Sequence, residues 1–339
     1  MLRYRTQGVL AAGLGLLITG CFSDPDLKTG LTPEGAPRVL AVLAVDNNQG
    51  AEPPSFCRYD AAGNLDPKGP SLVQGITICP DTKAMFDADG PAELEPLAWN
   101  LRTMFDELLN GDKVETLVDS ELDAQDNTQP CTADSATCVG HIGTTDFGAT
   151  LPFDVSCGGM PLTYDGYYYP NGNKESFPVG PALVLAPIDL APTDTDCTFT
   201  IKPTVVIDKQ GEAVPTGPNE NVFTVHVKQL DVVETDPVDA AAVADRGVIP
   251  PDGAVIMLFN SLIDPASVAA GDIEIRNLDT DAVVASDFDI ADNELDIFGA
   301  ADLPAGNYSA SIKAASIVSD VVGGTRTFTD GVTVRFVVE

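Results

Sequence analysis

The hydrophobic positions of this chain fall in short runs rich in Val, Ile, Thr and Phe, and clusters of Gly, Pro, Asp and Asn separate the runs. Clear examples are RVLAVLAV, ALVLAPIDL, CTFTIKPTVVI, NVFTVHVKQL, GDIEIRNL, NYSASIKAASI and TVRFVVE. Long stretches with a helical period are nearly absent. Many short strands between turn signals are typical of a β-sandwich or barrel, so the pattern predicts an all-β protein.

One segment, residues 101–117 (LRTMFDELLNGDKVETL), resembles a helix when it is taken alone. An internal repeat argues against that interpretation. FDELLNGDKV, from Phe105, aligns without a gap with FNSLIDPASV, from Phe259, and the second copy contains Pro265. Proline inside a helix removes a backbone hydrogen bond and clashes with the preceding turn. Both copies are therefore predicted to be a strand followed by a turn or one helical turn.

The repeat continues along the chain. LAPTDTDCTFTIK aligns with LPAGNYSASIK, and each copy then reaches an Asp with a Gly three residues later. These pairs are Asp208 with Gly211 and Asp320 with Gly323. The offset between copies falls from 154 at Phe105 and Phe259 to 111 at Lys202 and Lys313, so the first copy carries about 43 extra residues. The sequence predicts two domains of one kind, residues 38–229 with insertions and residues 230–339 without them.

The N-terminal segment has another pattern. Two arginines precede an uncharged apolar run, residues 9–18, and small residues then lead to Gly20 and Cys21. That order is typical of an export signal, and ten apolar residues are too few to span a bilayer as a helix. Residues 18–21 (ITGC) resemble the lipobox of bacterial lipoprotein signal peptides. The resemblance implies cleavage between Gly20 and Cys21 and a lipid on Cys21; an ordinary secretory signal is the alternative.

Residues 1–20 are thus predicted to be a lipoprotein signal peptide. Residues 21–37 (CFSDPDLKTGLTPEGAP) have no hydrophobic period and are predicted to be a flexible tether. Phe22 follows the cysteine, where an aspartate would resemble an inner-membrane retention signal. The expected location is therefore the cell envelope, as an outer-membrane lipoprotein.

Charge narrows the range of partners. The chain has 18 Lys and Arg against 51 Asp and Glu, a formal net charge of −33. Nucleic acid is excluded as a partner, because affinity for the phosphate backbone comes mainly from basic side chains. Acids spread along a chain are typical of a solvated surface that keeps a protein dispersed. Binding of divalent cations remains an alternative at this stage.

Cysteine usage points to an oxidising compartment. Beyond Cys21 the chain has an even number of cysteines, which in an exported protein predicts three disulfides. Six cysteines allow fifteen pairings, and we favour nearest neighbours. The expected pairs are Cys57 with Cys79, Cys131 with Cys138, and Cys157 with Cys197. A zinc site is the weaker alternative, since there is no CxxC and neither histidine lies at ligand spacing. All six precede residue 200, so the last third must hold together by its core.

A family resemblance follows from these motifs. Residues 231–339 contain ETDPVDAA, LFNSLIDPASV, LPAGNYSASI, SDVVGG and VRFVV. This order resembles the bacterial Ig-like domain of the S-layer protein SbsA and many surface lipoproteins. In the first copy LAPT replaces LPAG, Cys197 replaces the tyrosine, and residues 49–91 form a further insertion. The resemblance implies two tandem Ig-like β-sandwiches, the first enlarged by disulfide-bearing insertions, and it implies no catalytic residues.

Catalytic motifs are missing from the sequence. It contains no GxSxG, HExxH, P-loop or GxGxxG pattern. The chain has two histidines, His141 and His226, and both are predicted to be structural, His226 on a solvent-facing strand. We therefore expect a protein that is not an enzyme and has no metal centre.

Two features keep a binding role open. The stretch YDGYYYPNGN offers four tyrosines to a sugar or a protein: Tyr164, Tyr167, Tyr168 and Tyr169. The alternative, which we favour, is a strand with alternate tyrosines packed inward before a turn. The acid run at residues 278–296 lacks the spacing of a helix-loop-helix calcium site. It is expected either to line solvated strand edges or to bind calcium between loops.

The sequence as a whole predicts a non-catalytic, lipid-anchored cell-envelope protein that acts as a spacer, display or binding module. Its expected partners are the membrane, through the lipid, and a protein or polysaccharide. Two alternatives remain at this stage. One is a secreted polysaccharide-acting hydrolase with a site in insertions 49–96 and 118–160, and the other is a calcium-stabilised adhesin. Calcium is the one cofactor considered.

Overall fold

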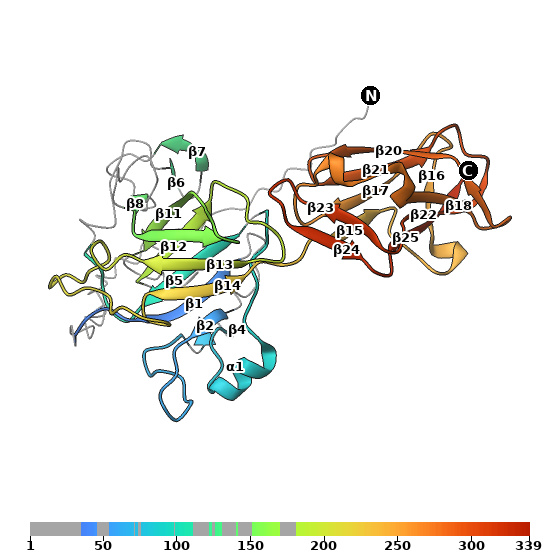
Figure 1. Cartoon of the computed structure of the whole chain (residues 1–339). Coiled ribbons are helices and arrows are strands. Elements are labelled where there is room, and N and C mark those ends of the chain that lie inside the picture. Colours follow the sequence, from blue (N-terminus) through green and yellow to red (C-terminus); the bar gives the residue numbers. More distant parts are fainter. Residues whose placement is uncertain are drawn as a thin grey trace, which may run out of the picture.

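The computed structural model describes residues 35–45, 54–70, 72–73, 76–97, 99–110, 122–123, 126–130, 140–141, 151–169 and 181–339. Most regular elements in these ranges are strands, and they form two β-sandwiches that lie next to each other in Figure 1. The all-β sandwich class expected from the sequence is confirmed. None of the helices in the described ranges has the length and apolar character needed to cross a membrane.

The first sandwich combines a six-stranded and a four-stranded sheet. The larger sheet has the strand order β2 (Pro54–Cys57), β1 (Val39–Val45), β5 (Asn100–Phe105), β12 (Ala182–Pro187), β11 (Tyr164–Tyr169) and β8 (Gly140–His141). The smaller sheet has the order β10 (Met160–Pro161), β9 (Phe153–Cys157), β13 (Asp196–Ile201) and β14 (Val222–His226). Segment 100–105, in the helix-like stretch, is a strand as expected.

The core of the first sandwich follows from the alternation of its strands. In β9 the side chains of Phe153, Val155 and Cys157 are buried, and Asp154 between them is exposed. Trp99 lies in the same core and meets Phe199 edge-on, with 5.8 Å between ring centroids. Because successive strand residues point to opposite faces, a period-two pattern is sufficient to give each sheet one apolar face.

A second, smaller core covers the outer face of the six-stranded sheet. Ala41, Leu43 and Met104 of the sheet pack there against Cys57, Ile78 and Cys79. This part of the chain also contains the short strands β3 (Leu72–Val73) and β4 (Ile76–Thr77) and the helix α1 (Lys83–Asp89). The described residues of the insertion expected at 49–91 therefore form a packed layer.

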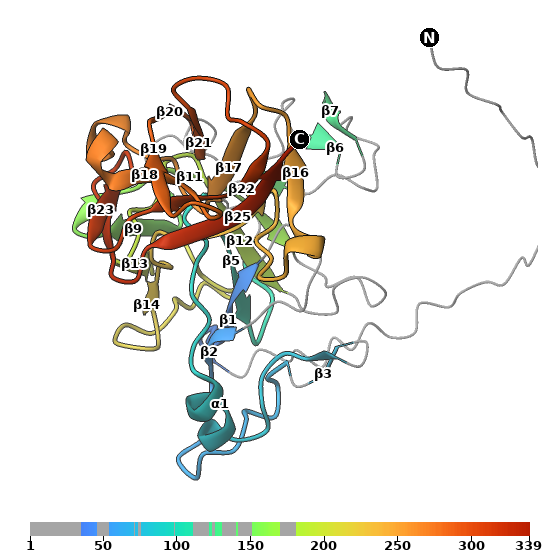
Figure 2. The same ribbon diagram turned by 90° about the vertical axis from the view of Figure 1, so that its right-hand side faces the viewer.

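Helix α1 was not expected from the sequence. Its start is capped by Thr82, whose side chain accepts a hydrogen bond from the Met85 amide at 3.4 Å. Gly90 ends it with a φ of 80°, a conformation that glycine adopts easily. Figures 1 and 2 both place α1 beyond β2, at the margin of the first sandwich. A seven-residue helix is too short to produce a clear periodic signal.

The second sandwich has a four-stranded and a five-stranded sheet. The first has the order β15 (Val232–Asp236), β17 (Ala254–Phe259), β21 (Glu294–Gly299) and β20 (Ser286–Ala291). The second has the order β16 (Gly247–Ile249), β25 (Val332–Val338), β22 (Gly306–Ile312), β18 (Ile273–Asn277) and β19 (Ala282–Val284). Phe259, Tyr308 and Phe336 are among the fully buried residues between them. This apolar core contains no disulfide, as the cysteine distribution requires.

Smaller elements complete the fold. They are the hairpin β23 (Ser316–Ser319) with β24 (Thr325–Phe328), the pair β6 (Leu122–Asp123) with β7 (Asp126–Pro130), and the 3-10 turns η1 (Val243–Asp245), η2 (Pro265–Ser267) and η3 (Ala270–Asp272). The turn η2 follows β17 and contains Pro265, so the strand-then-turn order expected for this copy is confirmed.

The internal repeat corresponds to repeated backbone pairing. Leu109 bridges Asp208 in the first sandwich, and Ile263 bridges Asp320 in the second. Further along the chain, Cys197 pairs with Val225 and Tyr308 pairs with Phe336, which lie at the constant offset of 111. The aligned Asp-x-x-Gly motifs therefore occupy the same place in both sandwiches.

The junction between the sandwiches contains no spacer. Strand β14 ends at His226 and β15 begins at Val232. The Asn260 side-chain amide donates a hydrogen bond to the Gln229 carbonyl at 2.9 Å, and Arg326 Nη1 donates to the Leu230 carbonyl at 2.7 Å. Side chains of the second sandwich thus hold the connecting backbone directly.

Candidate functional site

The predicted anchor and part of the predicted disulfide set lie outside the described residues. This applies to the cleavage site at Gly20 and Cys21, and to Cys131 and Cys138. Lipid attachment to Cys21 and the pairing of Cys131 with Cys138 stay predictions.

Two disulfides lie in the described part of the first sandwich. Cys57 bonds to Cys79, and Cys157 bonds to Cys197, which are the first and third pairs in nearest-neighbour order. The first ties the outer layer to β2, and the second joins directly opposed residues of β9 and β13, with Cα atoms 4.0 Å apart. Cross-links of this kind restrict the unfolded chain, and they are typical of proteins outside the reducing cytosol.

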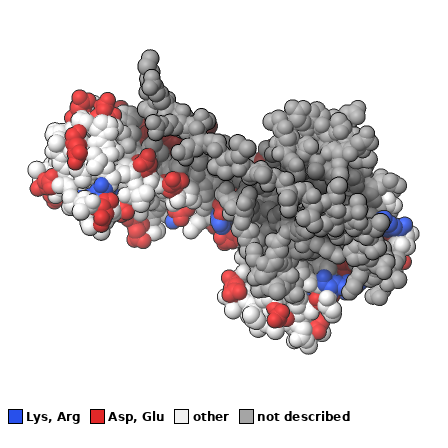
Figure 3. Space-filling model, turned by 180° about the vertical axis from the view of Figure 1, so that it is seen from behind, with Lys and Arg blue, Asp and Glu red and all other residues white. Residues whose placement is uncertain are grey.

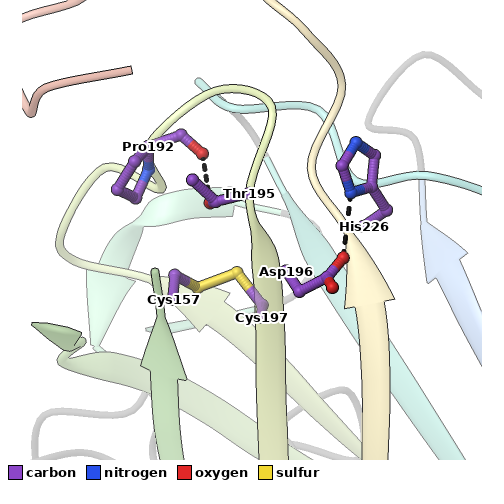
Figure 4. Close-up of a disulfide and its surroundings, with 6 residues drawn as sticks. All are labelled: Cys157, Pro192, Thr195, Asp196, Cys197 and His226. Carbon is purple, nitrogen blue, oxygen red and sulfur yellow. Dashed lines mark hydrogen bonds and ion pairs between the residues drawn. A yellow bond between two sulfur atoms is a disulfide. The ribbon is translucent and has the colours of Figure 1, made fainter. Parts of the chain in front are cut away.

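An ion-paired histidine lies beside the second disulfide (Figure 4). His226 Nδ1 is 2.9 Å from Asp196 Oδ1, and Nε2 is 3.4 Å from Asp194 Oδ1. The hydrogen bond to Asp196 is the main cause that raises the pKa of His226 above its ordinary value. His226 faces solvent from β14, as the sequence predicted, whereas its two carboxylate partners were missed. Asp196 lies opposite His226 in the β13–β14 register, so the pairing depends on knowing which strands are neighbours.

Tyr164 packs inward, which is the alternative favoured from the sequence, so its place among the possible binding tyrosines is corrected. Its side chain is 1% exposed, and its hydroxyl accepts from the Phe153 amide at 2.9 Å and donates to the Phe153 carbonyl at 3.1 Å. Burial raises the pKa of the phenol well above its ordinary value. Tyr164 is therefore a core residue and presents no ring to a partner. The side chains of Tyr167, Tyr168 and Tyr169 lie outside the described set, as does that of His141.

The acid run at residues 278–296 covers a sheet edge. Strand β20 is the last strand of its sheet, and Phe288 and Ile290 pack on the core. Asp287 Oδ1 accepts a hydrogen bond from the Phe288 amide at 3.0 Å, and Asp289 Oδ1 accepts from the Ile290 amide at 2.9 Å. Carboxylates at an edge hinder pairing with a strand of another molecule. This arrangement agrees with the solvated-edge interpretation.

Other acids of this run have local partners or repel one another. Asp281 pairs with Arg276 at 3.0 Å, and Asp296 raises the pKa of nearby Glu294 by charge repulsion. Figure 3 shows acidic side chains scattered over the visible face of the second sandwich, at left in that view, with few basic ones. Within the described ranges, no three His, Cys, Asp or Glu side chains gather closely enough to hold a metal ion.

A buried group of carboxylates lies at the end of the first sandwich where the chain enters β1. Asp106 accepts hydrogen bonds from the Arg38 amide at 2.7 Å and from Arg38 Nε at 3.1 Å. Its neighbour Glu107 is 5% exposed, and burial together with the charges of Asp106 and Asp208 raises the pKa of Glu107 to about 7. Asp208 is fully buried, and its Oδ2 has no hydrogen-bond partner. The sequence marked Asp208 as a repeat landmark but did not indicate its burial.

Comparisons with known proteins leave the family open. No protein-family model and no curated protein sequence matches the chain. Solved structures that resemble it include CopC from Methylosinus trichosporium OB3b, with 17% identity and a TM-score of 0.24 over 33% of this chain and 94% of that one. A titin fragment, A168169, has 7% identity and a TM-score of 0.23 over 73% and 92%. The N-terminal part of the bacterial S-layer protein SbsC has 12% identity and a TM-score of 0.20 over 71% and 41%. Similarity at this level supports no statement about activity or partners.

Proposed function

We propose that this protein is an exported, lipid-anchored component of the cell envelope whose two sandwiches act as a non-catalytic spacer that displays a binding surface. The observation that carries the proposal is the junction. The second sandwich begins within a few residues of the end of the first, and Asn260 and Arg326 hold the backbone between them. Domains joined by so few residues, with side chains of one domain bound to the connecting backbone, suit a stiff rod better than independent units.

The anchor and the compartment have separate support. The ITGC sequence would place a lipid on Cys21, and the disulfides require an oxidising compartment in which to form. Without residues 1–20, which contain Arg3 and Arg5, the net charge is −35, and it would repel an anionic membrane surface, so the tethered sandwiches would stand away from the lipid. The enlarged first sandwich is the expected contact surface, because loops on a rigid scaffold commonly carry recognition.

Intact mass measurement and non-reduced peptide mapping of the protein extracted from its native membrane test this proposal. We expect a mature chain that begins at Cys21, carries acyl mass and has no free thiol. A Cys21→Ser variant should lose the acyl mass and leave the membrane fraction, and Cys57 and Cys79 should stay bonded in it. A wild-type protein with an unmodified Cys21, or with free thiols at the other cysteines, would contradict the anchored, exported assignment.

A further inference from the structure

A buried hydrogen bond joins the two sandwiches outside the connecting backbone. The Thr193 amide, in the loop between β12 and β13, donates to Asp320 Oδ2 at 2.8 Å. Thr193 is 1% exposed and Asp320 is 2% exposed. The hairpin β23–β24, whose turn contains Asp320, lies on the side of the second sandwich that faces the first in Figure 1. Two residues 127 positions apart in the sequence thus meet in a solvent-free contact.

The same carboxylate also holds its own turn. Asp320 Oδ1 accepts from the Val322 amide at 3.0 Å and from the Gly324 amide at 2.7 Å. Oδ1 of Asp320 therefore accepts hydrogen bonds within the second sandwich, and Oδ2 accepts one from the first sandwich. Hydrogen bonds to a buried carboxylate are among the stronger ones, and loss of a partner leaves a desolvated charge.

Gly324 makes the close approach possible. A Cβ atom at this position would lie 2.6 Å from the Thr193 nitrogen, closer than atoms that are not bonded to each other can approach. A residue with a side chain at position 324 would therefore push the Thr193 loop away from Asp320. The glycine is needed here for space between two backbones.

We propose that Asp320 and Gly324 form a latch that locks the two sandwiches into one rigid body. The Thr193 contact and the backbone contacts of Asn260 and Arg326 lie at different points of the junction, so together they resist both bending and twisting. Interfaces between domains of one chain commonly allow relative motion, and this latch removes it. The inference concerns the folded chain alone and does not depend on the lipid anchor.

The first sandwich has the same turn but cannot form the same latch. Asp208 Oδ1 accepts from the amides of Gln210 and Glu212, at 2.9 and 2.6 Å, as Asp320 does in its own turn. Glu212, however, stands at the position of Gly324, so a Cβ atom is present where the second sandwich has none. Asp208 Oδ2 has no hydrogen-bond partner.

Residual dipolar couplings of residues 21–339, with Cys21→Ser in every sample, test the latch. A rigid body requires that one alignment tensor fit the backbone couplings of both sandwiches in the wild type. Gly324→Ala should require two tensors, because the added Cβ displaces the Thr193 loop. Gly271→Ala is the matched control in the same sandwich, since nothing lies within 4 Å of the Cβ it adds.

A second pair of variants acts from the other side of the contact. Thr193→Pro removes the donor and should also require two tensors, whereas Thr193→Ala keeps the amide and should retain one. Unchanged couplings within each sandwich will show that both domains remain folded. Separate tensors in the wild type, or a single tensor in both Gly324→Ala and Thr193→Pro, would overturn the proposal.

Discussion

Asp208 and Asp320 each accept hydrogen bonds from the amides two and four residues ahead, but only Asp320 has a partner for its second carboxylate oxygen. In the second sandwich the partner of Asp320 Oδ2 is the Thr193 amide. The residue that corresponds to Glu107 in the repeat is Ser261, which has no charge. In the first sandwich Asp208 shares its buried surroundings with Glu107. Glu107 therefore adds a buried carboxyl group beside Asp208, whereas Ser261 adds none beside Asp320.

Replacement of Glu107 should change how the stability of the first sandwich depends on pH. Its pKa of about 7 in the folded protein, against an ordinary 4.5, means that the folded state holds the proton more tightly than the unfolded state. The contribution to stability is complete below about pH 4.5 and is lost as the pH rises to about 7, by up to about 3 kcal/mol. The Glu107→Gln variant stays neutral, so it should be more stable than wild type at pH 8 and similar to it at pH 4.

Urea unfolding followed by fluorescence measures this difference, because Trp99 is the only tryptophan and lies in the core of the first sandwich. Glu234→Gln, at an exposed position of the second sandwich, should leave the Trp99 transition unchanged at both pH values. A constant difference between wild type and Glu107→Gln from pH 4 to pH 8 would show that Glu107 does not titrate in this range.

The two aspartates that contact His226 should affect its pKa unequally. Asp196→Asn removes the partner at 2.9 Å and should lower the pKa of His226, and Asp194→Asn, which removes the partner at 3.4 Å, should lower it less. Because the folded-state pKa is raised, the ion pair stabilises the fold fully below about pH 6.5 and loses this effect as the pH rises through the folded pKa. Titration of the imidazole NMR signals measures each pKa. Equal pKa values in wild type and Asp196→Asn would contradict the assignment.

The acidic edge strand should keep the protein from self-association. The double variant Asp287→Ala with Asp289→Ala removes the carboxylates that cover the edge amides of Phe288 and Ile290. We expect it to form dimers or larger species by sedimentation velocity at concentrations where the wild type is monomeric, because an open edge pairs with other strands. The charge-matched control is Asp252→Ala with Asp302→Ala, at exposed positions outside β20, and it should sediment like the wild type. Association of the control to the same extent would assign the effect to net charge alone.

Removal of the disulfide in the smaller sheet should destabilise the first sandwich selectively. Cys157→Ala with Cys197→Ala releases a cross-link across a sequence separation of 40 residues and should lower the unfolding free energy of this sandwich by about 2 to 4 kcal/mol. The Trp99 transition in urea should shift to lower denaturant, while the tertiary NMR signals of Tyr308 and Phe336 persist. An unshifted Trp99 transition would show that the bond does not limit the stability of the domain.

Sequence reasoning was most successful where structure depends on local alternation. The strands that contain Val39, Thr198, Ile275 and Val334 were expected from period-two patterns, because such a pattern buries one face whichever sheet the strand joins. The prediction of strand at residues 100–105 succeeded because Pro265 in the second copy excluded a helix there. Helix α1 was missed because seven residues are too few to show a helical period of hydrophobic positions.

The candidate site was harder to anticipate. Tyr164 looked like its neighbours in the sequence, and only its place in the core showed that its hydroxyl is bound to Phe153. The partners of His226 required the register of β13 against β14. Burial of Glu107 and Asp208 could not be derived either, since charged residues are expected at the surface unless packing shows otherwise.

The sequence by itself determined the all-β class, the order of the strands along the chain and the equivalence of the two repeats, because alternation and turn residues act over a few positions. Tertiary structure alone decided which acids are buried, which lie on an open edge, and that Thr193 meets Asp320 across the junction. The physical reason is distance along the chain. Backbone propensity acts between near neighbours, whereas burial and a hydrogen bond across 127 residues exist only after both sandwiches have folded and packed.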